Sequence, residues 1–212
     1  MSQKTCQKCQ KQFDLLQEDQ DFCDRIKVPY PANCPTCRLQ RRLLERNTRS
    51  LYYRKCDFSG KKILSSYHEA QPFPVYDQEI WWSDAWDASK YAKDYDFNKS
   101  FFEQFKELKN SVPHPSVFII GGTLQNSDFT NCTGYLKNCY LIFESDYDED
   151  CYYSNLLKNS KNIVDSYNCY ESELCYECID CQKSYNLFFS QDCENCSDSY
   201  FLKDCQGLKN CI

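Results

Sequence analysis

The sequence predicts a mainly β fold in three parts: an N-terminal zinc ribbon with a basic helix, a mixed aromatic-rich middle with one capping helix, and a C-terminal β-solenoid of about 12-residue coils. Two C-x-x-C pairs predict the first part, and a serine-capped run of phenylalanines predicts the helix. A sequence pattern that recurs every twelve residues predicts the solenoid. The expected domains are residues 1–50, 51–126 and 127–212.

Composition places limits on the compartment and on the cysteine chemistry. The chain has 212 residues and 17 cysteines, an odd number that cannot pair completely. Its first residues lead into Cys6 without an apolar run, and no segment approaches eighteen apolar residues. We therefore expect a cytoplasmic protein with free thiols or metal sites in preference to disulfides.

The N-terminal cysteines have the spacing of two zinc knuckles. Cys6 and Cys9 form one C-x-x-C pair, and Cys34 and Cys37 form the second, 24 residues further on. Four thiolates on two tight turns can close a tetrahedral zinc site with no open coordination position, which favours structural over catalytic zinc. Redox-active dithiols are the alternative. Cys23 lies between the pairs and is expected to be a buried thiol.

The order of residues around these knuckles resembles a bacterial probable zinc-ribbon domain. The match spans about residues 4–46 and rests on Cys6, Cys9, Phe13, Gln20-Asp-Phe22, Pro31, Cys34 and Cys37-Arg38. The layout of the whole chain resembles zinc-ribbon proteins of small-genome bacteria that continue through a Trp-Trp-rich middle into Cys-rich repeats. The resemblance implies a zinc site and supplies no activity.

Five arginines follow the second knuckle in a stretch rich in helix formers. At about 100° per residue they fall within an arc of roughly 140° on a helix over residues 38–49; they are Arg38, Arg41, Arg42, Arg46 and Arg49. The leucines at 39, 43 and 44 are expected on the opposite side, packed on the ribbon. Residues 1–56 carry 12 Lys and Arg against 6 Asp and Glu, whereas residues 127–212 carry 6 against 15. This asymmetry favours a nucleic-acid or ribosome contact at the head, with a solvated helix face as the alternative.

The middle combines a predicted hairpin with clustered tryptophans. Residues 52–67 should form a hairpin that turns at Ser59-Gly60. Trp81, Trp82 and Trp86 favour aromatic packing between ribbon and solenoid; a hydrolase or transferase cleft using the carboxylates of Asp84 or Asp87 is the alternative. Asn98 or Ser100 should cap a helix that ends before Pro113 and covers the first coil.

The last third of the chain repeats with a period of twelve. Stepping by twelve from Tyr140 gives Tyr152, Val164, Tyr176, Phe188 and Tyr200, whereas stepping by eighteen gives Tyr140, Lys158, Tyr176 and Glu194, which share no property. Cysteine or serine at every third position suits the narrow interior of a short coil. The spacing resembles the twelve-residue β-helix of beetle antifreeze proteins in architecture alone, because their Thr-x-Thr face is missing.

The repeat contains a second group of closely spaced cysteines. They can be read as a second thiol or metal site, or as packed interior thiols; they are Cys175, Cys178, Cys181, Cys193 and Cys196. A thiol-based redox or metal-storage protein is thus another alternative. The aromatic column should be covered by the middle or should contact a protein partner or a second copy. Because the repeat stops at Cys211-Ile212, we expect a truncated product or an end closed by self-association.

These observations favour a non-enzymatic, zinc-binding scaffold or binding module that contacts nucleic acid through its arginine helix. Catalytic patterns are sparse: neither His68 nor His114 lies near a nucleophile motif, and the sequence contains no phosphate-binding or dinucleotide-binding glycine pattern.

Overall fold

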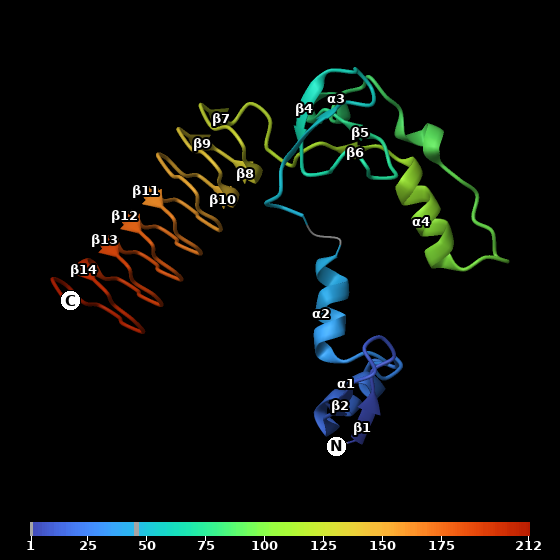
Figure 1. Cartoon of the computed structure of the whole chain (residues 1–212), viewed down its shortest axis with the longest axis horizontal. Helices are drawn as coiled ribbons and strands as arrows, with labels where there is room; N and C mark the ends of the chain where they lie inside the picture. Colours follow the sequence, from blue (N-terminus) through green and yellow to red (C-terminus); the bar gives the residue numbers. More distant parts are fainter. Residues whose placement is uncertain (1, 45–46) are drawn as a thin grey trace. The chain divides into compact units, whose positions relative to one another are not determined.

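The computed structural model describes residues 2–44 and 47–212. The chain forms two compact units, Met1–Asn47 and Thr48–Ile212 (Figure 1). We call the first unit the head. The second contains the middle module, residues 48–123, and the solenoid, residues 124–212. The predicted domains 51–126 and 127–212 thus share one unit.

The head is a hairpin followed by two helices. Its elements are β1 (Ser2–Thr5), β2 (Gln12–Leu15), α1 (Gln17–Arg25) and α2 (Pro35–Leu43). β1 and β2 are antiparallel, and Gln10 adopts a positive φ of 59° in the turn between them. Helix α1 contributes the buried Cys23. Helix α2 begins with Pro35, whose fixed φ and missing N–H suit the first helical position.

Helix α2 is shorter than the sequence suggested. It ends at Leu43 with Leu44 as its C-cap, so the predicted helix over residues 38–49 is wrong in extent. Arg46 lies outside the described residues, and Arg49 belongs to the second unit. The side chains of Leu39 and Leu43 are 48% and 49% exposed. The leucine face is therefore open to solvent and does not pack on the ribbon.

The middle module is a small mixed fold around a buried aromatic cluster. Its elements are β3 (Tyr52–Lys55), β4 (Lys62–Ser65), β5 (Val75–Tyr76), α3 (Gln78–Trp81), the 3-10 helix η1 (Ala88–Tyr91), α4 (Phe101–Ser111) and β6 (His114–Pro115). Strands β3 and β4 form the predicted hairpin, with Gly60 at φ 71° in its turn. The core holds Cys56, Phe73 and Tyr76, and Trp81 and Trp86 pack on it. Trp81 and Trp86 thus serve packing within the module, whereas Trp82 is 63% exposed.

Of the two predicted caps, Asn98 and Ser100, helix α4 uses Ser100. Ser100 Oγ accepts the N–H of Glu103 at 3.3 Å, and the helix ends two residues before Pro113. Residues 118–120, and not this helix, bond to the first coil of the solenoid. The carbonyl of Phe118 accepts the N–H of Thr133, and the N–H of Ile120 donates to the carbonyl of Thr133. The Ile120 side chain lies over Gly134, where a Cβ would come within 2.6 Å of it.

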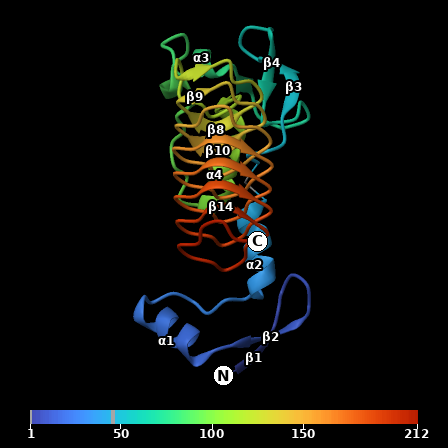
Figure 2. The same ribbon diagram turned by 90° about the vertical axis from the view of Figure 1, so that its left-hand side faces the viewer.

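The solenoid consists of parallel coils stacked in a constant register (Figure 2). Its strands are β7 (Leu124–Gln125), β8 (Asn131–Gly134), β9 (Leu136–Lys137), β10 (Phe143–Asp146), β11 (Lys161–Val164), β12 (Glu173–Tyr176), β13 (Tyr185–Phe188) and β14 (Ser197–Tyr200). Each pairs with residues twelve positions away, as in Ile163 with Cys175 and Cys175 with Leu187. Tyr140 is bridged to Tyr152. The predicted 12-residue coil is confirmed.

Each coil is built from four triplets of residues that share one backbone conformation. The first residue of a triplet points inward, the second points outward, and the third points outward with a positive φ. These third residues recur every three positions from Asn126 to Asn210, and those other than glycine have φ values of 46–63°. The left-handed conformation bends the chain four times in each coil. Roughly half of these corner residues are Asn or Asp, which tolerate it, and Val, Ile, Thr and Pro are missing from the set.

The interior serines and cysteines also complete the hydrogen bonding of the coils. The inward N–H of one coil bonds the side chain twelve residues earlier, as in Cys178 N to Ser166 Oγ at 3.1 Å. Ser166 Oγ in turn donates to the carbonyl of Val164 at 2.9 Å. Because a buried amide without a partner is costly, an inward serine stabilises the next coil by accepting its N–H as well as by fitting the narrow interior.

Arg49 is fixed to one face of the solenoid. Its guanidinium lies 5.7 Å from the ring centroid of Tyr167, and its Nε donates to the Asn155 amide oxygen at 3.1 Å in the orientation that satisfies both groups. The carbonyl of the preceding Thr48 accepts from Asn131 Nδ2 at 3.0 Å. Arg49 therefore holds the start of the second unit against its own coils.

Candidate metal centre

The first knuckle is formed by the turn of the head hairpin. Cys6 N donates to Lys11 O at 2.9 Å, and Gln10 N donates to Cys6 O at 3.0 Å, so the chain reverses over these residues. Cys6 is fully buried and Cys9 is exposed at the tip of the turn. Both thiols therefore project from one tight turn, as a zinc knuckle requires.

The second knuckle is formed by the entry into α2. Cys34 is the N-cap of this helix, and its sulfur accepts the N–H of Cys37 at 3.5 Å. Gln7 N donates to Ala32 O at 3.0 Å, which holds the second knuckle beside the first. Lys8 Nζ also donates to Gln40 Oε1 at 2.9 Å and ties α2 to the hairpin turn.

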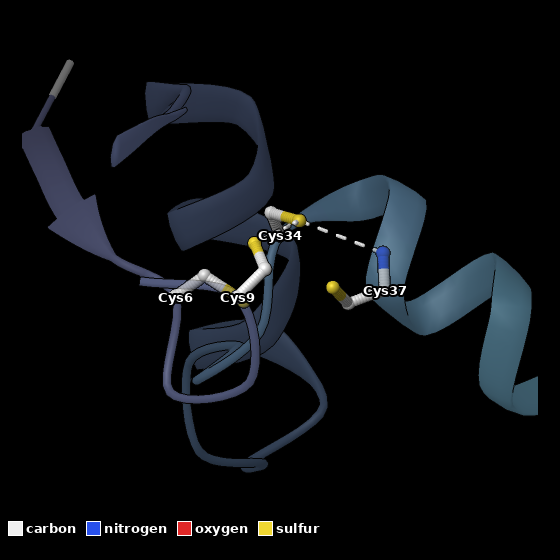
Figure 3. A group of neighbouring side chains, drawn as sticks. All are labelled: Cys6, Cys9, Cys34 and Cys37. Atoms are coloured by element: carbon white, nitrogen blue, oxygen red, sulfur yellow. Dashed lines mark hydrogen bonds between the residues drawn. The ribbon is translucent and has the colours of Figure 1, made fainter. Parts of the chain in front are cut away.

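The four sulfurs converge as predicted (Figure 3). Those of Cys6, Cys9, Cys34 and Cys37 all lie within 4.8 Å of one another, and Cys9 Sγ lies 3.8 Å from Cys34 Sγ. A tetrahedral zinc ion with Zn–S bonds of about 2.3 Å places its sulfurs about 3.8 Å apart. The donor set and its spacing therefore fit a metal ion.

The protonation of the cluster is uneven. Burial acts to raise the pKa of Cys6, but the backbone N–H groups of Cys34, Cys9 and Lys8 outweigh it and lower the pKa to about 6 from 9.0. Burial and the neighbouring sulfurs raise the pKa of Cys37 to about 12. A bound divalent cation would displace the remaining thiol protons, so metal affinity should fall as the pH falls.

The cysteines of the proposed second thiol site all lie in the solenoid interior. Cys175, Cys178, Cys181, Cys193 and Cys196 are buried. Within residues 2–44 and 47–212, three or more potential metal ligands converge to within 4.8 Å in the head cluster and in no group of solenoid thiols. The hydrogen bond with Cys175 and burial raise the pKa of Cys178 to about 12 despite an opposing bond to Cys181. Such thiols are poor nucleophiles.

Three of the predicted arginines remain on the head helix. Arg41 and Arg42 are exposed in the last turn of α2, and Arg38 is half-buried in its first turns. Arg49 belongs to the second unit, where it donates to Asn155 and its guanidinium lies over the Tyr167 ring.

Two polar groups near the alternative catalytic site, Asp87 and His114, have structural contacts, and Asp84 is exposed. Asp87 caps η1 by accepting the Ser89 hydroxyl at 2.7 Å and N–H at 2.9 Å, and these bonds lower its pKa. His114 lies 4.1 Å from the Phe73 ring, and its Nε2 is 3.0 Å from Lys109 O. A cavity of about 290 Å³ beside α4 is lined by residues 93–108 and includes neither Asp84 nor Asp87. This arrangement favours packing over catalysis.

No family model, curated protein or solved structure matches the chain. The zinc-ribbon-like character of the head therefore rests on the geometry of its four cysteines. Across the described part of the chain, no helix combines the length and apolarity needed to cross a membrane.

Proposed function

We propose that this protein is a non-enzymatic zinc-binding scaffold whose head contacts nucleic acid. The closed cluster of Cys6, Cys9, Cys34 and Cys37 carries the proposal. Four protein thiolates fill a tetrahedral coordination sphere, which leaves no position for a substrate or an activated water. Zinc here would stabilise the fold of the head, and we place the protein in the cytoplasm, where its thiols would stay reduced.

The metal would also fix the direction of α2 within the head. Cys34 caps the helix and Cys37 lies in its first turn, so both ligands of the second knuckle belong to the start of α2. The exposed Arg41 and Arg42 lie two turns further on. A rigid helix that presents guanidinium groups suits phosphate recognition, including ribosomal RNA, and the positive charge of residues 1–56 supports an anionic partner.

The solenoid offers the scaffold surface. In its aromatic column, the side chains of Tyr140, Tyr152 and Tyr200 are 37%, 37% and 39% exposed. This column is the proposed contact for a protein partner or a second copy. Sedimentation velocity at increasing concentration tests self-association, and a constant monomer would leave a different protein as the partner.

Metal content tests the first half of the proposal. Protein purified under reducing conditions should contain one zinc ion per chain, and the variant with Cys34→Ser and Cys37→Ser should contain none. Content well above one ion per chain would favour the metal-storage alternative that the solenoid cysteines suggested. A metal-free wild-type chain would contradict the proposal.

Charge reversal on α2 tests the second half. Arg41→Glu with Arg42→Glu should abolish retention on RNA or DNA at moderate salt, and it should reduce the slope of log affinity against log salt by about 2 if each arginine contacts a phosphate. The matched control, Arg25→Glu with Lys27→Glu, makes the same change in net charge at the end of α1. Equal losses in both variants would mean that net charge, not α2, determines binding.

A further inference from the structure

The middle-module hairpin repeats the head hairpin with an offset of fifty residues. In the head Ser2 pairs with Leu15 and Thr5 with Gln12; in the module Tyr52 pairs with Ser65 and Lys55 with Lys62. The turns also agree. Cys56 N donates to Lys61 O at 2.8 Å and Gly60 N donates to Cys56 O at 2.8 Å, matching the bonds of Cys6 with Lys11 and of Gln10 with Cys6.

The second half of the ribbon is also present. In the head, Gln7 N donates to Ala32 O at 3.0 Å, and Cys34 caps α2 two residues later. In the module, Asp57 N donates to Val75 O at 3.0 Å, and Asp77 caps α3 two residues later. The head and the middle module thus share a hairpin, a segment hydrogen-bonded to its turn, and a helix that begins shortly after that segment; the segment is a strand (β5) in the module and a bend in the head.

This correspondence assigns a counterpart to each zinc ligand. Cys6, Cys9, Cys34 and Cys37 correspond to Cys56, Ser59, Asp77 and Ile80. Burial agrees at the two hairpin positions: Cys6 and Cys56 are 0% and 1% exposed, and Cys9 and Ser59 are exposed. One of the four sulfur positions is kept, and the other three hold a hydroxyl, a carboxyl and an aliphatic group.

Hydrogen bonds and apolar packing occupy the place of the metal. Cys56 Sγ accepts the N–H of Asp77 at 3.2 Å and of Ser59 at 3.5 Å, so backbone donors join the two knuckles through the sulfur. Burial would raise the pKa of Cys56, but these bonds lower it overall. Ile80 packs on the same cluster as Cys56, together with Trp81 and Trp86. The frame therefore holds together without zinc.

We propose that residues 52–81 form a second zinc-ribbon frame that has lost its metal and retains a latent tetrahedral metal site at Cys56, Ser59, Asp77 and Ile80. The site would take a thiolate-preferring divalent cation, zinc or cobalt, once the three missing thiols are supplied. The inference rests on the geometry of the frame and does not depend on nucleic-acid binding or on zinc occupancy of the head.

The test installs the missing ligands in a full-length chain whose head cannot bind metal. The parent carries Cys34→Ser and Cys37→Ser, and the test variant adds Ser59→Cys, Asp77→Cys and Ile80→Cys. Titration with Co²⁺ under reducing conditions should give no tetrahedral thiolate spectrum for the parent and one equivalent per chain for the test variant. A further Cys56→Ser substitution should reduce the intensity of the thiolate-to-cobalt charge-transfer band by about one quarter or abolish binding.

A second variant controls for the loss of apolar packing that Ile80→Cys would cause. Ser59→Cys with Asp77→Cys keeps the isoleucine and supplies three thiolates, so it should bind one Co²⁺ more weakly. If both variants retain the parent's circular dichroism and tryptophan fluorescence yet bind no Co²⁺, the proposal is overturned. Loss of the fold in the double variant also overturns it, because Ser59 is exposed, Asp77 is half-buried and a ribbon frame accepts cysteine at both positions.

Discussion

Asp148 places a carboxyl group in the solenoid interior, at a position where the following coils carry Ser160, Ser172 and Ser184. Its side chain is 2% exposed; Oδ1 accepts the N–H of Ser160 at 2.9 Å, and Oδ2 finds no hydrogen-bond partner among the described residues. Burial raises its pKa to about 8 from 3.8, against the Ser160 N–H, and Cys139 and Asp146 add to the rise. We predict that Asp148→Ser stabilises the solenoid increasingly as the pH rises.

The sign follows from proton uptake. Below pH 4 the carboxyl is protonated in both states and imposes no ionisation penalty. Between pH 4 and 8 the folded chain keeps a proton that the unfolded chain has released, so stability falls by about 1.4 kcal/mol per pH unit. At pH 7 the penalty is about 4 kcal/mol, and it levels off above pH 8. Serine removes this penalty and still offers an oxygen to Ser160 N.

Urea unfolding at pH 5, 6, 7 and 8 measures the effect. Tryptophan fluorescence follows the second unit selectively, because Trp81, Trp82 and Trp86 all lie in it. Asp148→Ala is the control: it removes the carboxyl and also the acceptor, so its gain should be smaller by about 1–3 kcal/mol. Stability curves for wild type and Asp148→Ser that run parallel over this pH range would refute the reasoning.

Three further substitutions test the triplet rule of the solenoid. Ser166→Ala leaves the inward N–H of Cys178 without its acceptor and should lower the free energy of unfolding in urea by about 1–3 kcal/mol. The control Ser197→Ala removes an outward side chain and should lower it by less than about 0.5 kcal/mol. Equal losses in the two variants would contradict the role of the interior hydrogen bonds. Leu174 occupies a corner with φ 56°, so Leu174→Asn should raise the free energy of unfolding by about 1 kcal/mol, and a lower urea midpoint would contradict the assignment of strain to that corner.

Local patterns were enough to predict the repeat and the four-cysteine cluster. The twelve-residue spacing of Tyr140, Tyr152 and Tyr176 follows from the stacking of identical coils, since each side chain lies on its counterpart in the next coil. The C-x-x-C pairs similarly encode a ligand set, because a tight turn places residues i and i+3 side by side. Gly60 and Ser100 marked a turn and a helix start through backbone preferences that act within a few residues.

Contacts between residues distant in sequence determined the extent of the arginine helix and the exposure of its leucines. The arginine periodicity through Arg49 suggested one helix, yet Arg49 bonds Asn155 and stacks on Tyr167, and these bonds lie more than a hundred residues away in sequence. Leu39 and Leu43 were expected to be buried because they share one face, but a helix pattern does not determine whether anything covers that face.

The sequence by itself determined the coil length, the inward Cys and Ser, and the four-cysteine site, because each depends on spacing along the chain. Tertiary structure alone revealed that the hairpin around Cys56 repeats the head, since three of the four positions that correspond to the head cysteines hold other residues and the strand register and backbone hydrogen bonds show the likeness. It also placed the Asp148 carboxyl inside the solenoid, where its cost depends on the coils above and below it.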